Sequence, residues 1–308
     1  MNDIGGGMKD NETMLLFKEV LQRLNALLPL APNELDWSKP AFRWVRRTCL
    51  GTVVGRLEPV EKFAAVNPDE LLHIDSQKRQ LLENTEQFVR GLTANNVLLT
   101  GARGTGKSSL IRACVTCFYD NGLRLIEVDK DDLRDLADIV RLISSRPERF
   151  ILFCDDLSFE LGEGGYKALK VALDGSVAAG GDNLVVYATS NRRHLMPEPQ
   201  VDNLGAKLDE VGELHPGEVL EEKLSLAERF GMWLSFYPFT QAEYLKVLDA
   251  SLAELGVDDG VRQSEDTRLE ALQFAIQRGG RSGRVAVQFA RALAGRIKLE
   301  RLKCDRHA

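Results

Sequence analysis

The chain has 308 residues, of which 44% are hydrophobic and 28% charged, a composition typical of globular proteins with a substantial core. Its net charge is −6, so the chain as a whole does not attract nucleic acid, and such a contact would need a local patch of basic residues. No apolar run reaches membrane-spanning length, the N-terminus lacks the order of a signal peptide, and the five cysteines show no disulfide-framework spacing. We therefore expect a cytoplasmic protein without a membrane span.

The first sixty residues divide into two parts. Apolar residues follow helical spacing over residues 13–30, which predicts an amphipathic helix that packs on the body of the protein or on a neighbour. Residues 32–59 are expected to be irregular. Their aromatic and arginine side chains suit either a contact surface for a partner or nucleic acid, or an arm clamped onto the core, and we favour the arm. The cluster consists of Trp37, Phe42, Arg43, Trp44, Arg46 and Arg47.

A helix is predicted over residues 71–90, and a short apolar run follows it at residues 97–99. A glycine-rich segment comes directly after this run. Its glycines let the backbone turn so that successive N–H groups point at an anion. Lys107 can reach the β- and γ-phosphates of a nucleotide, and the Ser108 hydroxyl can ligate Mg²⁺ where a helix begins. The pattern predicts a loop that binds ATP with Mg²⁺, and its residues are Gly101, Ala102, Arg103, Gly104, Thr105, Gly106, Lys107, Ser108 and Ser109.

Beyond this loop, helical and apolar strand patterns alternate. We expect helices over residues 108–119, 133–145, 166–177 and 218–230, and strands over residues 123–128, 150–154, 184–189 and 232–236. These four strands and the strand before the loop are expected to form a five-stranded parallel sheet, and the helices are expected to cover both of its faces. Residues 192–217, with three prolines, form a long loop of the kind that is usually functional or disordered.

From Pro238 onward only helical patterns occur. Thr240 and Glu243 form a capping box, and helices are expected over residues 242–255, 267–277 and 282–302. We therefore expect an N-terminal helical and irregular extension (1–60), a nucleotide-binding α/β core (61–237) and a helical lid domain (238–308).

Two carboxylates and an amide follow strands of the predicted sheet. Asp155 and Asp156 close the strand 150–154, where Asp155 would hold Mg²⁺ and Asp156 would orient or deprotonate the attacking water. Asn191 follows the next strand at its carboxyl end, where ligands bind in open parallel sheets, and its amide can hold the water or the γ-phosphate.

Two arginines complete the candidate site. Arg229 lies on the outer face of its predicted helix, where it is either solvated or offered to a neighbouring subunit. Arg284 starts the last helix after two glycines, with Arg281 close by, and could reach the γ-phosphate from the lid.

Together these motifs resemble those of AAA+ ATPases. The resemblance makes residues 101–108 a Walker A motif, residues 150–156 a Walker B motif, Asn191 sensor 1, Arg229 an arginine finger, and Arg284 sensor 2, a role for which Arg281 is the alternative. Longer phrases such as FRWVRR, ANNVLLTGARGTGKSSL, CDDLSFE, TSNRRHL and EEKLSLAERFGMWLSFYPF resemble a bacterial family of AAA+ proteins classed as a domain of unknown function. The resemblance covers about residues 41–291. It implies an ATP-binding core, a helical lid and a homo-oligomer in which Arg229 completes the next subunit's site, and it leaves the protein client unidentified.

Two departures from the AAA+ pattern narrow the function. Where many AAA+ enzymes have Asp-Glu, this chain has Asp155 and Asp156, whose shorter side chain sets the carboxylate back, and a misplacement near 1 Å costs about a hundredfold in rate. Slow hydrolysis is therefore expected, with Glu160 as a weakly supported substitute. The region after the second strand, EVDKDDLRDL, lacks the aromatic pore loop of AAA+ proteins that unfold other proteins by threading them, so a threading unfoldase is disfavoured.

The leading hypothesis is an ATPase that acts as a switch, a remodelling protein or a loader. The alternatives are a nucleotide-dependent binding and assembly module that hydrolyses poorly, and a P-loop kinase with residues 192–217 as its lid. Arg229 and the helical domain fit the AAA+ hypothesis better than the kinase. Whether FRWVRR binds DNA stays open.

Overall fold

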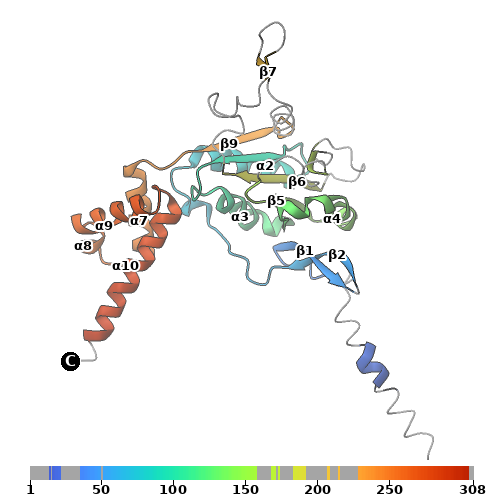
Figure 1. Cartoon of the computed structure of the whole chain (residues 1–308), viewed down its shortest axis with the longest axis horizontal. Helices are drawn as coiled ribbons and strands as arrows, with labels where there is room; N and C mark the ends of the chain where they lie inside the picture. The colour runs from blue at the N-terminus through green and yellow to red at the C-terminus, as the bar shows by residue number, and fades with distance from the viewer. Residues whose placement is uncertain are drawn as a thin grey trace, which may run out of the picture.

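The computed structural model describes residues 14, 16–21, 35–49, 51–157, 168–170, 173, 183–191, 207–208, 214–215 and 228–304. Figure 1 shows a sheet flanked by helices, with the C-terminal helices, orange to red, lying to one side. Residues 16–21 are helical and exposed, and they belong to the helix predicted over residues 13–30. Residues 168–170 and 173 are also helical, and they belong to the helix predicted over residues 166–177. Residues 218–227 and Glu160 lie outside the described residues, and the last residues of the helix predicted over 218–230 form a turn.

A seven-stranded sheet forms the core, in the order β2-β1-β4-β5-β6-β3-β9. The five predicted strands are present and parallel, with β6 between β3 and β5. A separate antiparallel pair joins β7 (Lys207–Leu208) to β8 (Leu214–His215). The strands of the large sheet are β1 (Ala41–Cys49), β2 (Thr52–Pro59), β3 (Val97–Gly101), β4 (Leu123–Glu127), β5 (Arg149–Cys154), β6 (Leu184–Ser190) and β9 (Met232–Phe236).

The expectation that residues 32–59 are irregular is wrong, because β1 and β2 form an antiparallel hairpin there. β1 adds to the sheet beside β4, so the sheet has seven strands instead of five. At the start of β1, Phe42 and Trp44 are buried and Arg43 is exposed between them, which is the period-two pattern of a half-buried strand.

Helices cover both faces of the sheet, as predicted. α4 packs on one face with Leu98, Phe150 and Leu152, whereas α2 and α3 pack on the other with Leu99 and Phe153. The helices are α2 (Asp75–Val89), α3 (Lys107–Phe118) and α4 (Leu136–Ile143), with short 3₁₀ turns η2 (Pro68–Glu70), η3 (Tyr119–Asn121) and η4 (Lys130–Asp135).

The C-terminal region is helical, as predicted, and has its own hydrophobic cluster around Tyr244, Leu248 and Ala271. Its helices are α7 (Gln241–Glu254), α8 (Asp259–Arg262), α9 (Glu265–Gln277) and α10 (Gly283–Cys304), of which α8 was not predicted. The capping box of Thr240 and Glu243 is present at the start of α7. In the described ranges, no helix is long and apolar enough to cross a membrane. The domain boundaries stay a prediction.

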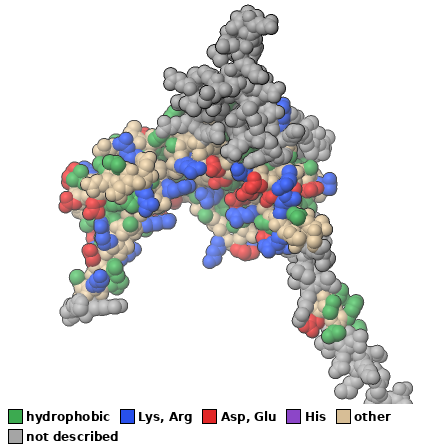
Figure 2. Space-filling model, in the orientation of Figure 1, with side chains coloured by type: hydrophobic (Ala, Val, Ile, Leu, Met, Phe, Trp, Pro, Cys, Tyr) green, Lys and Arg blue, Asp and Glu red, His purple; other side chains and the backbone are tan. Residues whose placement is uncertain are grey.

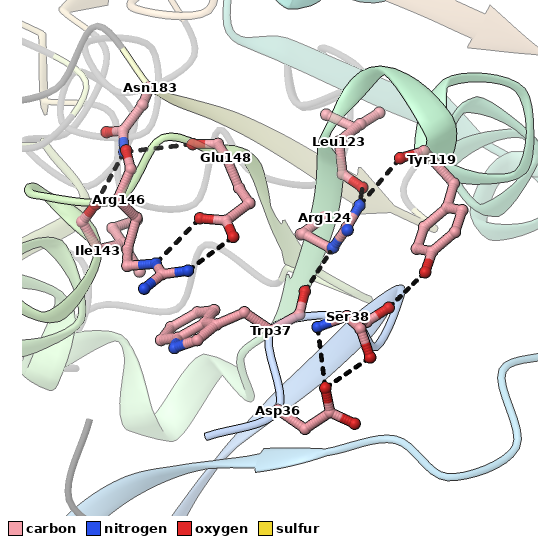
Figure 3. A network of polar contacts seen from close by, with 10 residues as sticks. All are labelled: Asp36, Trp37, Ser38, Tyr119, Leu123, Arg124, Ile143, Arg146, Glu148 and Asn183. Atoms are coloured by element: carbon pink, nitrogen blue, oxygen red, sulfur yellow. Dashed lines mark hydrogen bonds and ion pairs between the residues drawn. The ribbon is translucent and has the colours of Figure 1, made fainter. Parts of the chain in front are cut away.

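The segment before β1 is fixed to the core by the buried Trp37 ring. The ring centroid lies 5.0 Å from that of Phe42 and 5.7 Å from that of Phe150, and the Arg146 guanidinium lies 4.7 Å above the Trp37 ring. Arg146 is in turn held by Glu148 at 2.7 Å (Figure 3). The aromatic clamp is therefore confirmed for this part of the chain.

Arg124 fixes the backbone of the same segment. Its guanidinium donates to the main-chain oxygens of Trp37 at 2.9 Å, Tyr119 at 3.0 Å and Leu123 at 2.8 Å. These residues are drawn in Figure 3. The Tyr119 hydroxyl donates to the main-chain oxygen of Ser38. Because a buried guanidinium needs its donors satisfied, this segment and the core stabilise one another.

Replacing Trp37 with alanine is expected to lower the free energy of unfolding by about 3 kcal/mol, because it leaves a cavity against Phe42 and Phe150. Trp233, which is 44% exposed on β9, is the matched control, and its replacement by alanine should cost less than about 1 kcal/mol. Urea unfolding followed by circular dichroism measures both values. Equal losses for the two variants would contradict the clamp.

The arginines of β1 lie beside acidic side chains. Arg43 pairs with Glu127 at 2.9 Å, Arg47 with Glu58 at 3.0 Å, and Arg46 with Asp135 at 3.3 Å. Figure 2 shows basic and acidic side chains intermixed on the visible face. This pairing reduces the local positive charge and argues against a nucleic-acid contact through FRWVRR.

Candidate nucleotide-binding site

The glycine-rich loop joins β3 to α3 at the carboxyl end of the sheet. Gly101 has a φ of 126°, and a Cβ atom there would lie 1.9 Å from the main-chain oxygen of Phe236, so only glycine fits. Ala102 N–H donates to that same oxygen at 3.2 Å, which ties the loop to β9. Ser108 and Ser109 lie in the first turn of α3, whose N–H groups have no partner within the helix and favour an anion.

Lys107 is buried inside this loop. Its Nζ donates to the main-chain oxygens of Gly101 and Ala102, both at 2.8 Å, and to Asn191 Oδ1 at 3.1 Å. Burial lowers the pKa of Lys107 to about 8, an effect that Asp155 and Asp156 partly offset. The ammonium group therefore stays charged at neutral pH, at the point where phosphates would meet the loop.

Asp155 is positioned by two hydroxyl groups. Ser108 Oγ donates to Asp155 Oδ1 at 2.8 Å, and Thr189 Oγ1, at the end of β6, donates to the same oxygen at 2.5 Å. Thr189 was not predicted, because it belongs to a buried apolar strand. In the described part of the chain, no group of three or more His, Cys, Asp or Glu could hold a metal. The adjacent hydroxyl and carboxylate of Ser108 and Asp155 fit Mg²⁺, a hard cation that takes few protein ligands besides phosphates and water.

Asp156 has both carboxylate oxygens engaged. Asn191 Nδ2 donates to Oδ1 at 2.5 Å, and an Arg103 guanidinium nitrogen lies 3.4 Å from Oδ2. The backbone of Asp156 is left-handed, with a φ of 52°, a conformation that Asp and Asn tolerate better than other non-glycine residues. The structure thus brings Asp156 and Asn191 together, and it adds a contact from Arg103 that was not predicted.

The start of α10 contacts the tip of the loop. Arg284 N–H donates to the main-chain oxygen of Gly104 at 3.3 Å, and a Cβ at Gly104 would lie 2.9 Å from the Arg284 Cβ. The positive charge of Arg284 also contributes to lowering the pKa of Lys107. Arg284, an exposed side chain, therefore adjoins the loop from the helical region.

Arg229 lies elsewhere, in a turn just before β9, where it is half-buried. β9 runs parallel to β3, with Met232 beside Val97 and Phe236 beside Gly101. The loop begins at Gly101, beside the C-terminal end of β9, whereas Arg229 lies just before the N-terminal end of β9. The length of β9 separates these two ends by roughly 13 Å. The structure therefore does not place Arg229 at the loop of its own chain.

Comparisons with known proteins agree with this geometry. Residues 38–297 match the family described as protein of unknown function (DUF815). No curated protein sequence matches the chain. The structure resembles the Thermotoga maritima RuvB P216G mutant, with a TM-score of 0.51 and 18% identity, over 76% of this chain and 67% of that one. It also resembles the Aeropyrum pernix ORC1 protein, solved in complex with DNA, with a TM-score of 0.53 and 16% identity, over 76% of this chain and 65% of that one.

This chain therefore spans about two thirds of the length of each of these two proteins. At these identities the likeness shows the fold. The family match covers far more than half of the chain, and the chain belongs to the DUF815 family and has the AAA+ P-loop fold.

Proposed function

We propose that this protein is a Mg²⁺-dependent AAA+ ATPase that acts as a switch, a remodelling protein or a loader on a protein client. The observation that carries the proposal is the hydrogen-bonded cluster at the loop. Lys107 donates a hydrogen bond to Asn191, which follows β6, and Ser108 donates one to Asp155, which follows β5. Cation, hydroxyl, carboxylate and amide are the groups that phosphoryl transfer requires, at one edge of one sheet.

Each residue has a definite task in this proposal. Bound Mg²⁺ would neutralise charge that develops on the phosphates. Ser108 and Asp155 hold the cation, and Lys107 exchanges a loop carbonyl for phosphate oxygens. Asp156 accepts a hydrogen bond from the attacking water while Asn191 fixes the carboxylate, and Arg284 approaches the terminal phosphate from α10.

The position of Arg229 supports a site shared between subunits. An arginine side chain is too short to span the length of β9 back to its own loop, so Arg229 is better placed to serve another chain. A head-to-tail contact of this kind repeats around a closed ring. We therefore include a homo-oligomer in the proposal, with Arg229 as the residue that one subunit supplies to the next.

A second candidate is a binding module that uses ATP to set its conformation or assembly and hydrolyses it poorly. The observation that favours it is that the Asp156 side chain is short and that both of its carboxylate oxygens already accept hydrogen bonds. A carboxylate so engaged has less freedom to align a water molecule, and positioning errors are costly in rate.

Steady-state ATP turnover per chain, measured against protein concentration, tests the proposed function. We expect turnover that rises with concentration and that chelation of Mg²⁺ abolishes, because the site is completed between subunits. Single-stranded DNA is added in a parallel series, where stimulation would identify a partner. Negligible turnover at every concentration, with ATP still bound, would favour the binding module instead.

A further inference from the structure

Arg103 occupies a position in the loop that the phosphate-binding role alone does not explain. It is the second residue after Gly101, so its backbone belongs to the loop, while its side chain reaches Asp156 after β5. The Arg103 side chain is 73% exposed and the Asp156 side chain 53% exposed, so both are open to an incoming ligand.

The contact engages the second oxygen of the Asp156 carboxylate. Asn191 already donates to Oδ1, and Arg103 lies against Oδ2. Each carboxylate oxygen has about two acceptor positions, so a donor on each oxygen takes up about half of the positions that a water molecule could use. Asp156 therefore accepts more readily from a water molecule when Arg103 moves away or turns to another acceptor.

The phosphate of a bound nucleotide is such an acceptor. Arginine pairs with phosphate through two parallel N–H groups, and such pairs are shorter and stronger than a single contact at 3.4 Å between exposed groups. Arg103 belongs to the loop for which we propose phosphate binding, and its exposed side chain is long enough to turn from Asp156 toward that loop.

We propose that Asp156 and the terminal phosphate of ATP compete for Arg103, so that phosphate binding frees Asp156. Arg103 is a positioning residue in this scheme: it acts on the attacking water only through Asp156. The inference rests on the proposed function, because it assumes that the loop binds ATP. It gives the site a coupling in which the carboxylate becomes more available when a terminal phosphate is present.

A double-mutant cycle tests the competition, using Arg103→Gln, Asp156→Asn, the double variant and the wild type. Asparagine tolerates the left-handed backbone at position 156 and still offers Asn191 an oxygen, but it no longer attracts Arg103. The dissociation constants of ATPγS and ADP with Mg²⁺ are measured by calorimetry. We expect Asp156→Asn to tighten ATPγS binding by about two- to fivefold when Arg103 is present, the range of an exposed ion pair, and to leave it nearly unchanged in the Arg103→Gln background.

ADP is the control ligand, because it lacks the terminal phosphate, and its binding should show no such coupling. Arg103→Lys is the control variant, because it keeps the charge and loses the forked geometry, and it should retain part of the coupling. Equal tightening in both backgrounds would overturn the inference, since Asp156 would then act by its charge alone. ATP binding without coupling refutes the inference and leaves the proposed function standing, whereas a wild type that binds neither nucleotide refutes both.

Discussion

Replacing Lys107 with alanine is expected to weaken ATP binding by about 10³-fold, because it removes up to three charge-assisted hydrogen bonds. The ammonium group is held inside the loop by Gly101, Ala102 and Asn191, so it is oriented before the phosphates arrive. Among the described residues, Arg284 meets the loop from outside, at Gly104, and Arg103 contacts Asp156, so neither takes the place of the ammonium group. The dissociation constant of a fluorescent ATP analogue measures the loss.

Lys78 provides a matched control for this variant. Its Nζ also donates to two main-chain oxygens, those of Pro68 at 2.9 Å and Leu71 at 3.2 Å, but it lies on α2, outside the loop. Lys78→Ala should therefore leave ATP binding within about twofold of wild type, whatever it does to stability. A loss below tenfold for Lys107→Ala, or similar losses for both variants, would remove Lys107 from the binding site.

The parallel strands could be predicted because each is a short apolar run that is buried on both faces. β5 shows this most clearly, since Phe150 to Cys154 are all buried. The hairpin was missed because apolar residues and arginines are interspersed in β1 without a continuous apolar run, a pattern that also fits the surface of an irregular arm. Period-two alternation around Phe42 and Trp44 was the available signal.

The loop cluster could be predicted in part, because parallel strands end at the same edge and bring Asp155 and Asn191 near the loop. The contact between Arg103 and Asp156 could not, because it depends on where a loop backbone aims a long side chain. The same holds for Gly104, whose lack of a side chain lets α10 approach the loop. The catalytic roles of Asp156, Asn191, Arg229 and Arg284 stay predictions.

Replacing Arg229 with alanine is expected to lower ATP turnover by about 10³- to 10⁵-fold, the range for an arginine that stabilises transferring phosphate from a neighbouring subunit. ATP binding should stay unchanged, because Arg229 lies at the opposite end of β9 from the loop of its own chain. Turnover and ATPγS affinity are measured side by side. Arg229→Lys is the control: it keeps the charge but not the fork, and should recover only a small part of the rate. Normal turnover in Arg229→Ala would disprove the assignment.

Mixing two inactive variants shows which subunit supplies the arginine. Arg229→Ala keeps an intact loop, and Lys107→Ala keeps an intact Arg229, so a contact between them contains one complete site. In an equimolar mixture that exchanges subunits at random, about a quarter of the head-to-tail interfaces should be complete, and turnover should return in proportion. A mixture as inactive as its two components would mean that Arg229 serves its own chain or does not act in hydrolysis. Restored turnover requires that loop and arginine come from different chains, because neither variant contains both.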